Sequence, residues 1–209
     1  DHKRLYTNAT NAEESSTYLG TTNLTSFDSG GFSVGSGSDT NNSGSTYVAW
    51  NWKANGTGVS NTDGTITSQV SANTTAGFSV VTYTGTGANA TVGHGLGVAP
   101  KFYMVKTRST TTNWAGYHVG IASAATQAIY LNLTNAANVD TTMWNSTAPT
   151  SSVFSLGTAG TINTSSSTYV AYCFADVEGY SKFGSYTGNG STDGPFAFTG
   201  FRPAFIIIK

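Results

Sequence analysis

Three histidines are the first residues in this chain that could do chemistry. His94 lies between glycines in "VGHGLG", where an imidazole could act as a ligand or a general base. The sequence shows no partner for such a role near His94, so we expect this residue to serve a turn or packing role. His2 and His118 are isolated, and we expect structural or surface roles for both.

A pair of carboxylates could support a different chemistry. Asp176 and Glu178 flank Val177, and this alternation would place both acids on one side of a strand. Two such carboxylates form the acid and base of a glycoside hydrolase. We interpret them instead as solvated linker residues, because they fall at a predicted module boundary. With few acids in the chain, we predict that the protein is not an enzyme, and a glycoside hydrolase remains the alternative.

Two glycine-rich loops and one cysteine complete the search for metal and nucleophile chemistry. Asp39 in "GSDTNNSG" and Asp193 in "GNGSTDG" have oxygen ligands that could hold Ca²⁺. The loops lack the carboxylate density of a strong site, and Asx turns explain them better. Cys173, the single cysteine, lies in the apolar run "TYVAYCF" and is expected to be a buried structural thiol. We therefore expect no metal and no cofactor.

Aromatic residues outside the strand-like runs are the most promising binding residues. Trp114, Tyr117 and Trp144 stand in loop-like contexts. Exposed rings of this kind could stack on sugar rings or anchor protein contacts. Packing inside the fold is the role we favour for each of the three, and ligand binding is the alternative.

The composition limits the classes of function. Only 9% of the 209 residues are charged and the net charge is -1, whereas typical domains are about a quarter charged. Phosphate binding needs clustered Lys and Arg, so we expect no nucleic-acid partner. No apolar run approaches the roughly 18 residues of a membrane span, so we expect no membrane association.

The elements that must position these residues are short strands. Runs such as "GFSVVTY", "KFYMVK", "TYVAYCF", "TYVAWNW" and "AFIIIK" are rich in β-branched and aromatic residues, and turn clusters separate them. No segment shows a convincing helical period, apart from a single turn expected within 122–128. In "TYVAWNW" we expect Val48, Trp50 and Trp52 to face the core. The pattern predicts an all-β fold of tandem antiparallel β-sandwich modules.

Internal repeats set the predicted domain organisation. Residues 31–52 resemble residues 153–174 at a constant offset of 122, which pairs Asn41 with Asn163 and Tyr47 with Tyr169. A second block repeats at an offset of 103, where "YTGTG" at 83–87 matches "YTGNG" at 186–190 and "KFYMVK" matches "AFIIIK". The intervening Gly, Ser, Thr and Asn-rich stretch is typical of a linker.

The repeats divide the chain into four parts. We predict the back half of a preceding module at 1–56, a linker at 57–75, a complete module at 76–178, and the front half of a following module at 179–209. The chain then looks like part of a longer tandem array. Because an unpaired apolar strand is an aggregation hazard, we expect "AFIIIK" to pair with the back half, in the same chain or in a neighbour.

Three phrases carry a resemblance to a known family: "YTGTG…TVGHGLGVAPKFYMVK", "TYVAYCFADVEGYSKFGSYTGNGSTDGPFAFTGFRP" and "DGTITSQVSANTTAGFS". Together they resemble a domain of unknown function found in tandem in marine bacteriophage proteins similar to tail fibres and other virion appendages. The likeness spans nearly the whole chain and implies a concanavalin-like or jelly-roll sandwich. It supplies no catalytic residues.

The resemblance and the composition together suggest a structural and adhesive module of a phage fibre or appendage. The implied location is the virion or the extracellular space. The implied partners are other copies of the chain in a homo-oligomer, other virion proteins and a host surface glycan. The alternative is a lectin-like carbohydrate-binding module of a cell-surface or filament protein.

Overall fold

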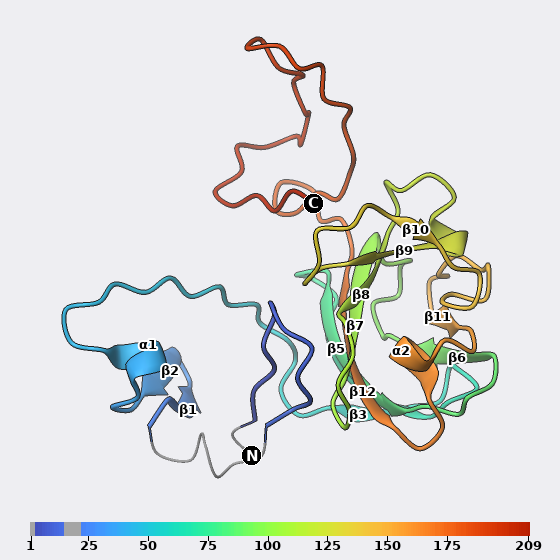
Figure 1. Cartoon of the computed structure of the whole chain (residues 1–209). Coiled ribbons are helices and arrows are strands. Elements are labelled where there is room, and N and C mark those ends of the chain that lie inside the picture. Colours follow the sequence, from blue (N-terminus) through green and yellow to red (C-terminus); the bar gives the residue numbers. More distant parts are fainter. Residues whose placement is uncertain (1–2, 15–21) are drawn as a thin grey trace.

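One large antiparallel sheet dominates the protein. The computed structural model describes residues 3–14 and 22–209 (Figure 1). In spatial order the eight strands of the large sheet are β10 (Asn138–Val139), β9 (Gln127–Tyr130), β8 (Ala115–His118), β7 (Phe102–Thr107), β12 (Thr168–Phe174), β5 (Phe78–Thr84), β4 (Ser68–Asn73) and β3 (Val59–Asn61). The predicted strands "GFSVVTY", "KFYMVK" and "TYVAYCF" are therefore confirmed, and they lie side by side at the centre of the sheet.

A smaller layer covers one face of this sheet. It consists of the two-stranded sheet of β6 (Ala90–Gly93) and β11 (Val153–Leu156) together with the short helix α2 (Gly160–Asn163) (Figure 1). Phe154 of β11 packs against Tyr103 and Tyr83 of the large sheet, with ring centroids 5.1 and 6.2 Å apart. The hydrophobic core lies between these two layers. The predicted single turn within 122–128 is the 3-10 helix η1 (Ala124–Thr126).

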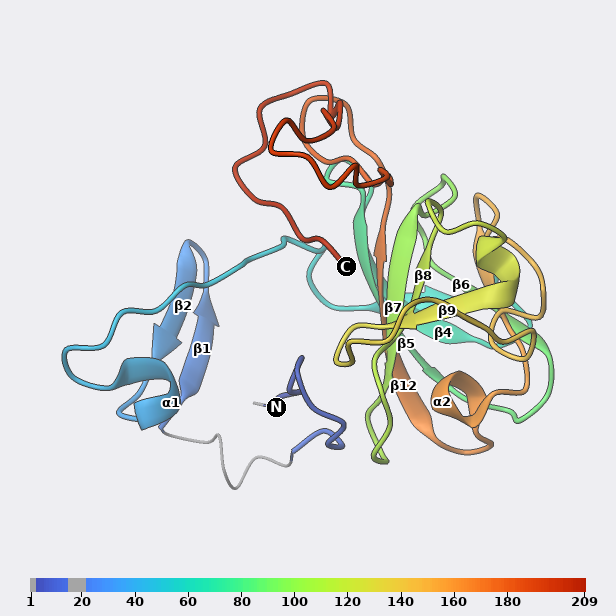
Figure 2. The ribbon, with the colours of Figure 1, turned by 45° about the horizontal axis from the view of Figure 1, so that its top comes forward.

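The first and last parts of the chain lie outside this core. The hairpin of β1 (Leu24–Asp28) and β2 (Gly31–Val34) and the helix α1 (Ser38–Asn41) stand apart from the large sheet, with the N-terminal segment between them (Figures 1 and 2). Residues 182–209 contain no strand and form a separate lobe of irregular chain in both views.

The predicted linker at 57–75 is wrong. Its residues form β3 and all of β4, and β4 pairs with β5 in a continuous register from Gln69↔Thr82 to Asn73↔Phe78. Val70 is buried against the core and the Ser68 hydroxyl donates a hydrogen bond to the Gly93 carbonyl. A polar composition suits this outer hairpin because every second side chain faces away from the core. The complete unit therefore begins near Val59 rather than at 76.

The pairing expected for the two outer parts is not formed within the chain. Residues 46–52 ("TYVAWNW") and 204–209 ("AFIIIK") are not assigned to strands. Ile206, Ile207 and Ile208 are 65–70% exposed, and Trp50 is 63% exposed. The expected burial of Val48, Trp50 and Trp52 is likewise wrong. These sequences have the propensity of strands, but a strand also needs a partner to satisfy its backbone groups.

Local hydrogen bonds nonetheless recur at the spacing of 122 residues. The Asn41 amide donates to the Gly35 carbonyl at 2.7 Å, and the Asn163 amide donates to the Gly157 carbonyl at 2.8 Å. In the same way, the hydroxyl of Tyr47 donates to the Ser38 carbonyl and that of Tyr169 to the Gly160 carbonyl, both at 2.9 Å. The residues from β2 to 52 thus share local geometry with those from β11 to 174.

The coarse fold prediction is confirmed, since the protein is mostly β with antiparallel sheets. Within the described ranges 3–14 and 22–209, none of the helices has the length and apolar character needed to cross a membrane.

Candidate functional site

A groove runs along the face of the large sheet that points away from the core. Its volume is about 500 Å³, and its floor comes from β5, β7 and β12. The N-terminal segment, residues 3–14, forms one wall, which we call the strap. Residues Trp52 and Ala54 form another part of the rim. A neighbouring hollow of about 350 Å³ shares Ala54, Val80 and Thr82 with the groove, so the two are continuous.

Strand alternation explains why the floor of the groove is aromatic. In β12, Tyr169, Ala171 and Cys173 face the core and are fully buried. Val170, Tyr172 and Phe174 therefore face the groove. Trp52 packs across this end of the groove, with its ring centroid 5.9 Å from that of Phe174 and 6.4 Å from that of Phe78. Because 42% of Trp52 is exposed, part of its ring is available to a ligand.

Hydrogen bonds fix the strap over the sheet. The Trp114 indole N–H donates to the Tyr6 carbonyl at 2.7 Å, and the Thr112 amide donates to the Thr10 carbonyl at 3.0 Å. The Arg108 guanidinium donates two hydrogen bonds to the Glu13 carboxylate, at 2.6 and 2.9 Å. Because a bidentate pair has a fixed geometry, it holds Glu13 and the strap in one orientation over the sheet.

The ion pair shifts the pKa of both Glu13 and Arg108. Partial burial opposes ionisation of Glu13, but the Arg108 hydrogen bonds and charge, with Lys3 at 3.5 Å, lower the pKa of this carboxyl overall. The hydrogen bond to Glu13 in turn raises the pKa of Arg108. At neutral pH, Glu13 and Arg108 are therefore both ionised and hydrogen-bonded to each other at the groove.

Lys106 of β7 lies beneath the strap. Its side chain is fully buried, and its ammonium group donates to the carbonyls of Thr10 and Thr107 at 3.2 and 3.1 Å. Burial lowers the pKa of Lys106. The strap thus replaces solvent for this cation.

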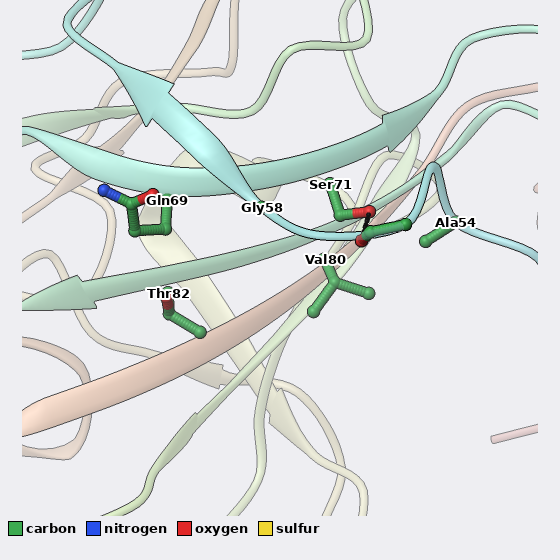
Figure 3. Close-up of a pocket in the computed structure, with 7 residues that line it drawn as sticks. Ala54, Gly58, Gln69, Ser71, Val80 and Thr82 are labelled. Carbon is green, nitrogen blue, oxygen red and sulfur yellow. Dashed lines mark hydrogen bonds between the residues drawn. The ribbon is translucent and has the colours of Figure 1, made fainter. Parts of the chain in front are cut away.

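The neighbouring hollow adds polar groups to the groove (Figure 3). The side chains of Gln69 and Ser71 extend from β4, and those of Val80 and Thr82 extend from β5. The Ser71 hydroxyl donates to the Gly56 carbonyl at 2.7 Å, which holds the segment before β3 against the sheet. This end of the groove offers amide and hydroxyl groups beside an apolar floor.

The three aromatic residues predicted as binding residues are not exposed. Trp144 is fully buried, its indole N–H donates to the Gln127 carbonyl at 2.8 Å, and its ring meets Tyr103 edge-on at 5.0 Å. Tyr117 stacks on Tyr103 at 4.8 Å. Trp114 is 3% exposed and lies at the edge of the groove under the strap. All three rings therefore pack inside the fold, which is the role we favoured for them, and the alternative of exposed binding rings is wrong. Tyr117 belongs to β8, inside the sheet between β7 and β9, and Trp144 packs on Tyr103 and Tyr117.

The other candidates have structural partners. His94 is fully buried, accepts a hydrogen bond from the Leu96 amide at Nδ1 (3.2 Å) and lies 3.1 Å from the Thr150 carbonyl at Nε2. Burial is the main cause that lowers the pKa of His94. Burial likewise raises the pKa of Cys173 to about 12, so this thiol stays protonated. The expected packing roles of His94 and Cys173 are confirmed.

The acidic candidates have structural partners outside the groove, and Asp39 belongs to the short helix α1. Asp176 accepts hydrogen bonds from the Lys182 ammonium at 2.8 Å and from the Phe183 amide at 2.9 Å. In the exposed turn of 189–193 the Asp193 carbonyl accepts a hydrogen bond from the Asn189 side-chain amide at 2.9 Å, and the Asp193 amide donates to the Ser191 hydroxyl at 3.1 Å. Asp39 pairs with Arg4 at 3.2 Å. Among the residues that the structure describes, no three His, Cys, Asp or Glu side chains gather as a metal site would require. His2 lies outside the described residues.

A family model described as a domain of unknown function, DUF7483, matches residues 1–209. The chain belongs to DUF7483. The predicted membership of a family of unknown function is thereby confirmed at that level. No curated protein matches the chain. No solved structure matches it either.

Sequence reasoning missed the groove residues of this DUF7483 chain. Tyr172 and Phe174 were treated as part of an apolar strand, and Trp52 as a core residue. The alternation within "TYVAYCF" contained the signal, because one set of side chains must face away from the core. Which set does so depends on the second layer, and the sequence alone does not specify it.

Proposed function

We propose that this DUF7483 chain is a structural and adhesive module of a phage fibre or other virion appendage, and that it binds host surface glycans in the groove. The groove carries this proposal. Its volume of about 500 Å³ lies within the range of small-ligand sites, roughly 300–1,000 Å³. The proposed location is the virion or the extracellular space.

The chemistry of the groove suits a carbohydrate. Sugar rings present C–H faces that stack on aromatic rings, and Trp52 has an exposed part of its ring at the rim. Sugar hydroxyls need donors and acceptors, and Gln69 and Thr82 present both on the adjoining floor. A low overall charge, 9% of residues, favours recognition of a neutral ligand.

Binding is favoured over hydrolysis. Among the residues that line the groove, Glu13 is the single carboxylate, and Arg108 holds it in a bidentate pair. A glycoside hydrolase needs two carboxylates on either side of the scissile bond. A lectin-like module of a cell-surface or filament protein would use the same groove, so the location of the protein separates that alternative from a virion appendage.

The finer architecture belongs to the same proposal. Asn41 and Asn163 make the same local hydrogen bond at corresponding positions, and so do Tyr47 and Tyr169. This recurrence favours tandem β-sandwich modules of a concanavalin-like or jelly-roll type. Tandem modules with few charges and short connections are suited to extended appendages.

A glycan array with matched variants tests the binding. We expect the wild-type chain to bind a subset of neutral glycans, and the double variant Gln69→Ala, Thr82→Ala to bind them at least about tenfold more weakly. Asn138→Ala, on the exposed strand β10, should bind like the wild type. Absence of binding to every glycan, or equal binding by all three proteins, would refute the role of the groove. Immunogold labelling of virions tests the location, and label confined to cells or free filaments would refute it.

A further inference from the structure

Two segments of the chain expose apolar surface that has a buried counterpart in the complete unit. Residues 31–52, the acceptor segment, include Val48, which is 82% exposed although its counterpart Val170 is buried. Residues 180–209, the donor segment, include Ile206 and Ile208, which are 65% and 69% exposed although their counterparts Tyr103 and Val105 are fully buried. The acceptor segment repeats the sequence from β11 to β12, and the donor segment repeats the sequence from β5 to β7.

The complete unit shows how these two kinds of segment fit together. Strand β12 lies between β5 and β7 and pairs with both, and β11 pairs with β6. In the complete unit the back half, β11 to β12, therefore pairs with the front half, β5 to β7. Residues 46–52 correspond in sequence to β12, and residues 204–209 correspond to β7. Within the described residues, neither segment forms a strand.

The register of the missing ladder follows from the repeat offsets. In the complete unit Ala171 lies opposite Val105 and Phe174 lies opposite Phe102. Subtracting 122 from the β12 numbers and adding 103 to the β7 numbers places Ala49 opposite Ile208 and Trp52 opposite Phe205.

Buried side-chain contacts transfer with the same offsets. Tyr83 and Tyr169 stack at 5.1 Å in the core, and their counterparts Tyr186 and Tyr47 are 50% and 49% exposed. Asn163 accepts a hydrogen bond from the Thr86 amide at 2.8 Å. The corresponding donor for Asn41 is the amide of residue 189. Both halves thus retain the residues that make the contacts of the complete unit.

Within one chain, Phe205 of the donor segment contacts two rings of the acceptor segment. Phe205 lies 5.1 Å from Trp50 and 6.5 Å from Trp52. The Lys209 ammonium is bound instead to carbonyls at 133 and 135, at 2.6 and 2.9 Å. The hairpin β1–β2 and the lobe formed by 184–204 lie on separate sides of the molecule in both views (Figures 1 and 2).

We propose that the acceptor segment of one copy binds the donor segment of a second copy, and that the two complete one β unit between chains. The mode is addition of a strand to exposed strand edges. Because the two surfaces differ, the association is head to tail and extends into rings or filaments. This inference goes beyond the proposed glycan binding and does not depend on it.

Disulfide cross-linking between two variants, each with one added cysteine, tests the register. Antiparallel neighbours have Cα atoms about 4.5–5.5 Å apart, within disulfide range. We expect oxidation of a mixture of Ala49→Cys and Ile208→Cys chains to give a species of twice the 21.6 kDa chain mass. A mixture of Ala49→Cys and Ile206→Cys should not do so, because these residues are displaced by two positions. Native Cys173 is fully buried and its raised pKa keeps it unreactive.

Light scattering over a concentration series provides the second measurement. The wild-type chain should form multimers, and Ile208→Asp should weaken the association at least about tenfold. Val139→Asp, at a 73% exposed position outside both segments, should associate like the wild type. A wild-type chain that stays monomeric would overturn the proposal. So would a cross-link that forms within an Ala49→Cys, Ile208→Cys double variant but never between the single variants, since it would show closure within one chain.

Discussion

Asn163 provides the sharpest quantitative test of the structure. Its side chain is fully buried and makes three hydrogen bonds to backbone groups, with the Thr86 amide at 2.8 Å, the Ala88 carbonyl at 2.7 Å and the Gly157 carbonyl at 2.8 Å. It therefore joins α2 to the loop between β5 and β6. Replacing Asn163 with Ala removes all three bonds, so the Thr86 amide and the two carbonyls lose this hydrogen-bond partner.

The expected loss follows from the number of bonds. At about 1 kcal/mol for each bond, Asn163→Ala should lower the free energy of unfolding by about 3 kcal/mol. For a protein of this size that corresponds to a fall in Tm of about 6–12 °C. Urea denaturation followed by tryptophan fluorescence measures the loss. An unchanged slope of the unfolding free energy against urea concentration would show that the folded state is otherwise intact.

The repeat supplies a matched control. Asn41 makes the equivalent hydrogen bond to the Gly35 carbonyl, but it is exposed. At low protein concentration, Asn41→Ala should therefore change the free energy of unfolding by no more than about 0.5 kcal/mol. A loss below about 1 kcal/mol for Asn163→Ala, or equal losses for the two variants, would refute the reasoning.

Three further substitutions test separate parts of the structure. Among the described residues the buried Tyr103 hydroxyl has no hydrogen-bond partner, whereas the Tyr83 hydroxyl donates at 2.7 Å, so Tyr103→Phe should keep or raise the Tm and Tyr83→Phe should cost about 1 kcal/mol. Burial lowers the pKa of His94, so the unfolded chain takes up the proton first. Stability should then fall as the pH drops below about 6.5, by at most about 1.4 kcal/mol per pH unit, and His94→Asn should reduce this slope. Glu13→Gln removes the charge that pairs with Arg108, so amide exchange should become faster in residues 3–14 while the unfolding of the large sheet is unchanged.

The sequence by itself determined the strands at the centre of the sheet. The runs that became β5, β7 and β12 combine β-branched and aromatic residues with flanking turns, and these local preferences agree with the final fold. The repeat also fixed which hydrogen bonds recur, since identical residues at a spacing of 122 form the same local turn around Asn41 and Asn163.

Composition misled where position in the sheet decides the outcome. The Gly, Ser, Thr and Asn-rich stretch at 57–75 has the composition of a linker, yet β4 is a strand because the edge of β5 is available to it. Trp114, Tyr117 and Trp144 stand among polar residues in the sequence, and they are buried because β8 and the second layer enclose them.

The tertiary structure alone decided the pairing, and with it the groove. "TYVAYCF" and "TYVAWNW" are nearly the same phrase, but the first is a central strand and the second is irregular and exposed. The difference is not local. The first has β5 and β7 on its two edges, whereas the second meets no ladder partner in the described parts of its own chain. Strand formation depends on backbone hydrogen bonds to residues distant in sequence, so a strand's sequence gives its propensity, and the presence of a neighbour decides whether the strand forms.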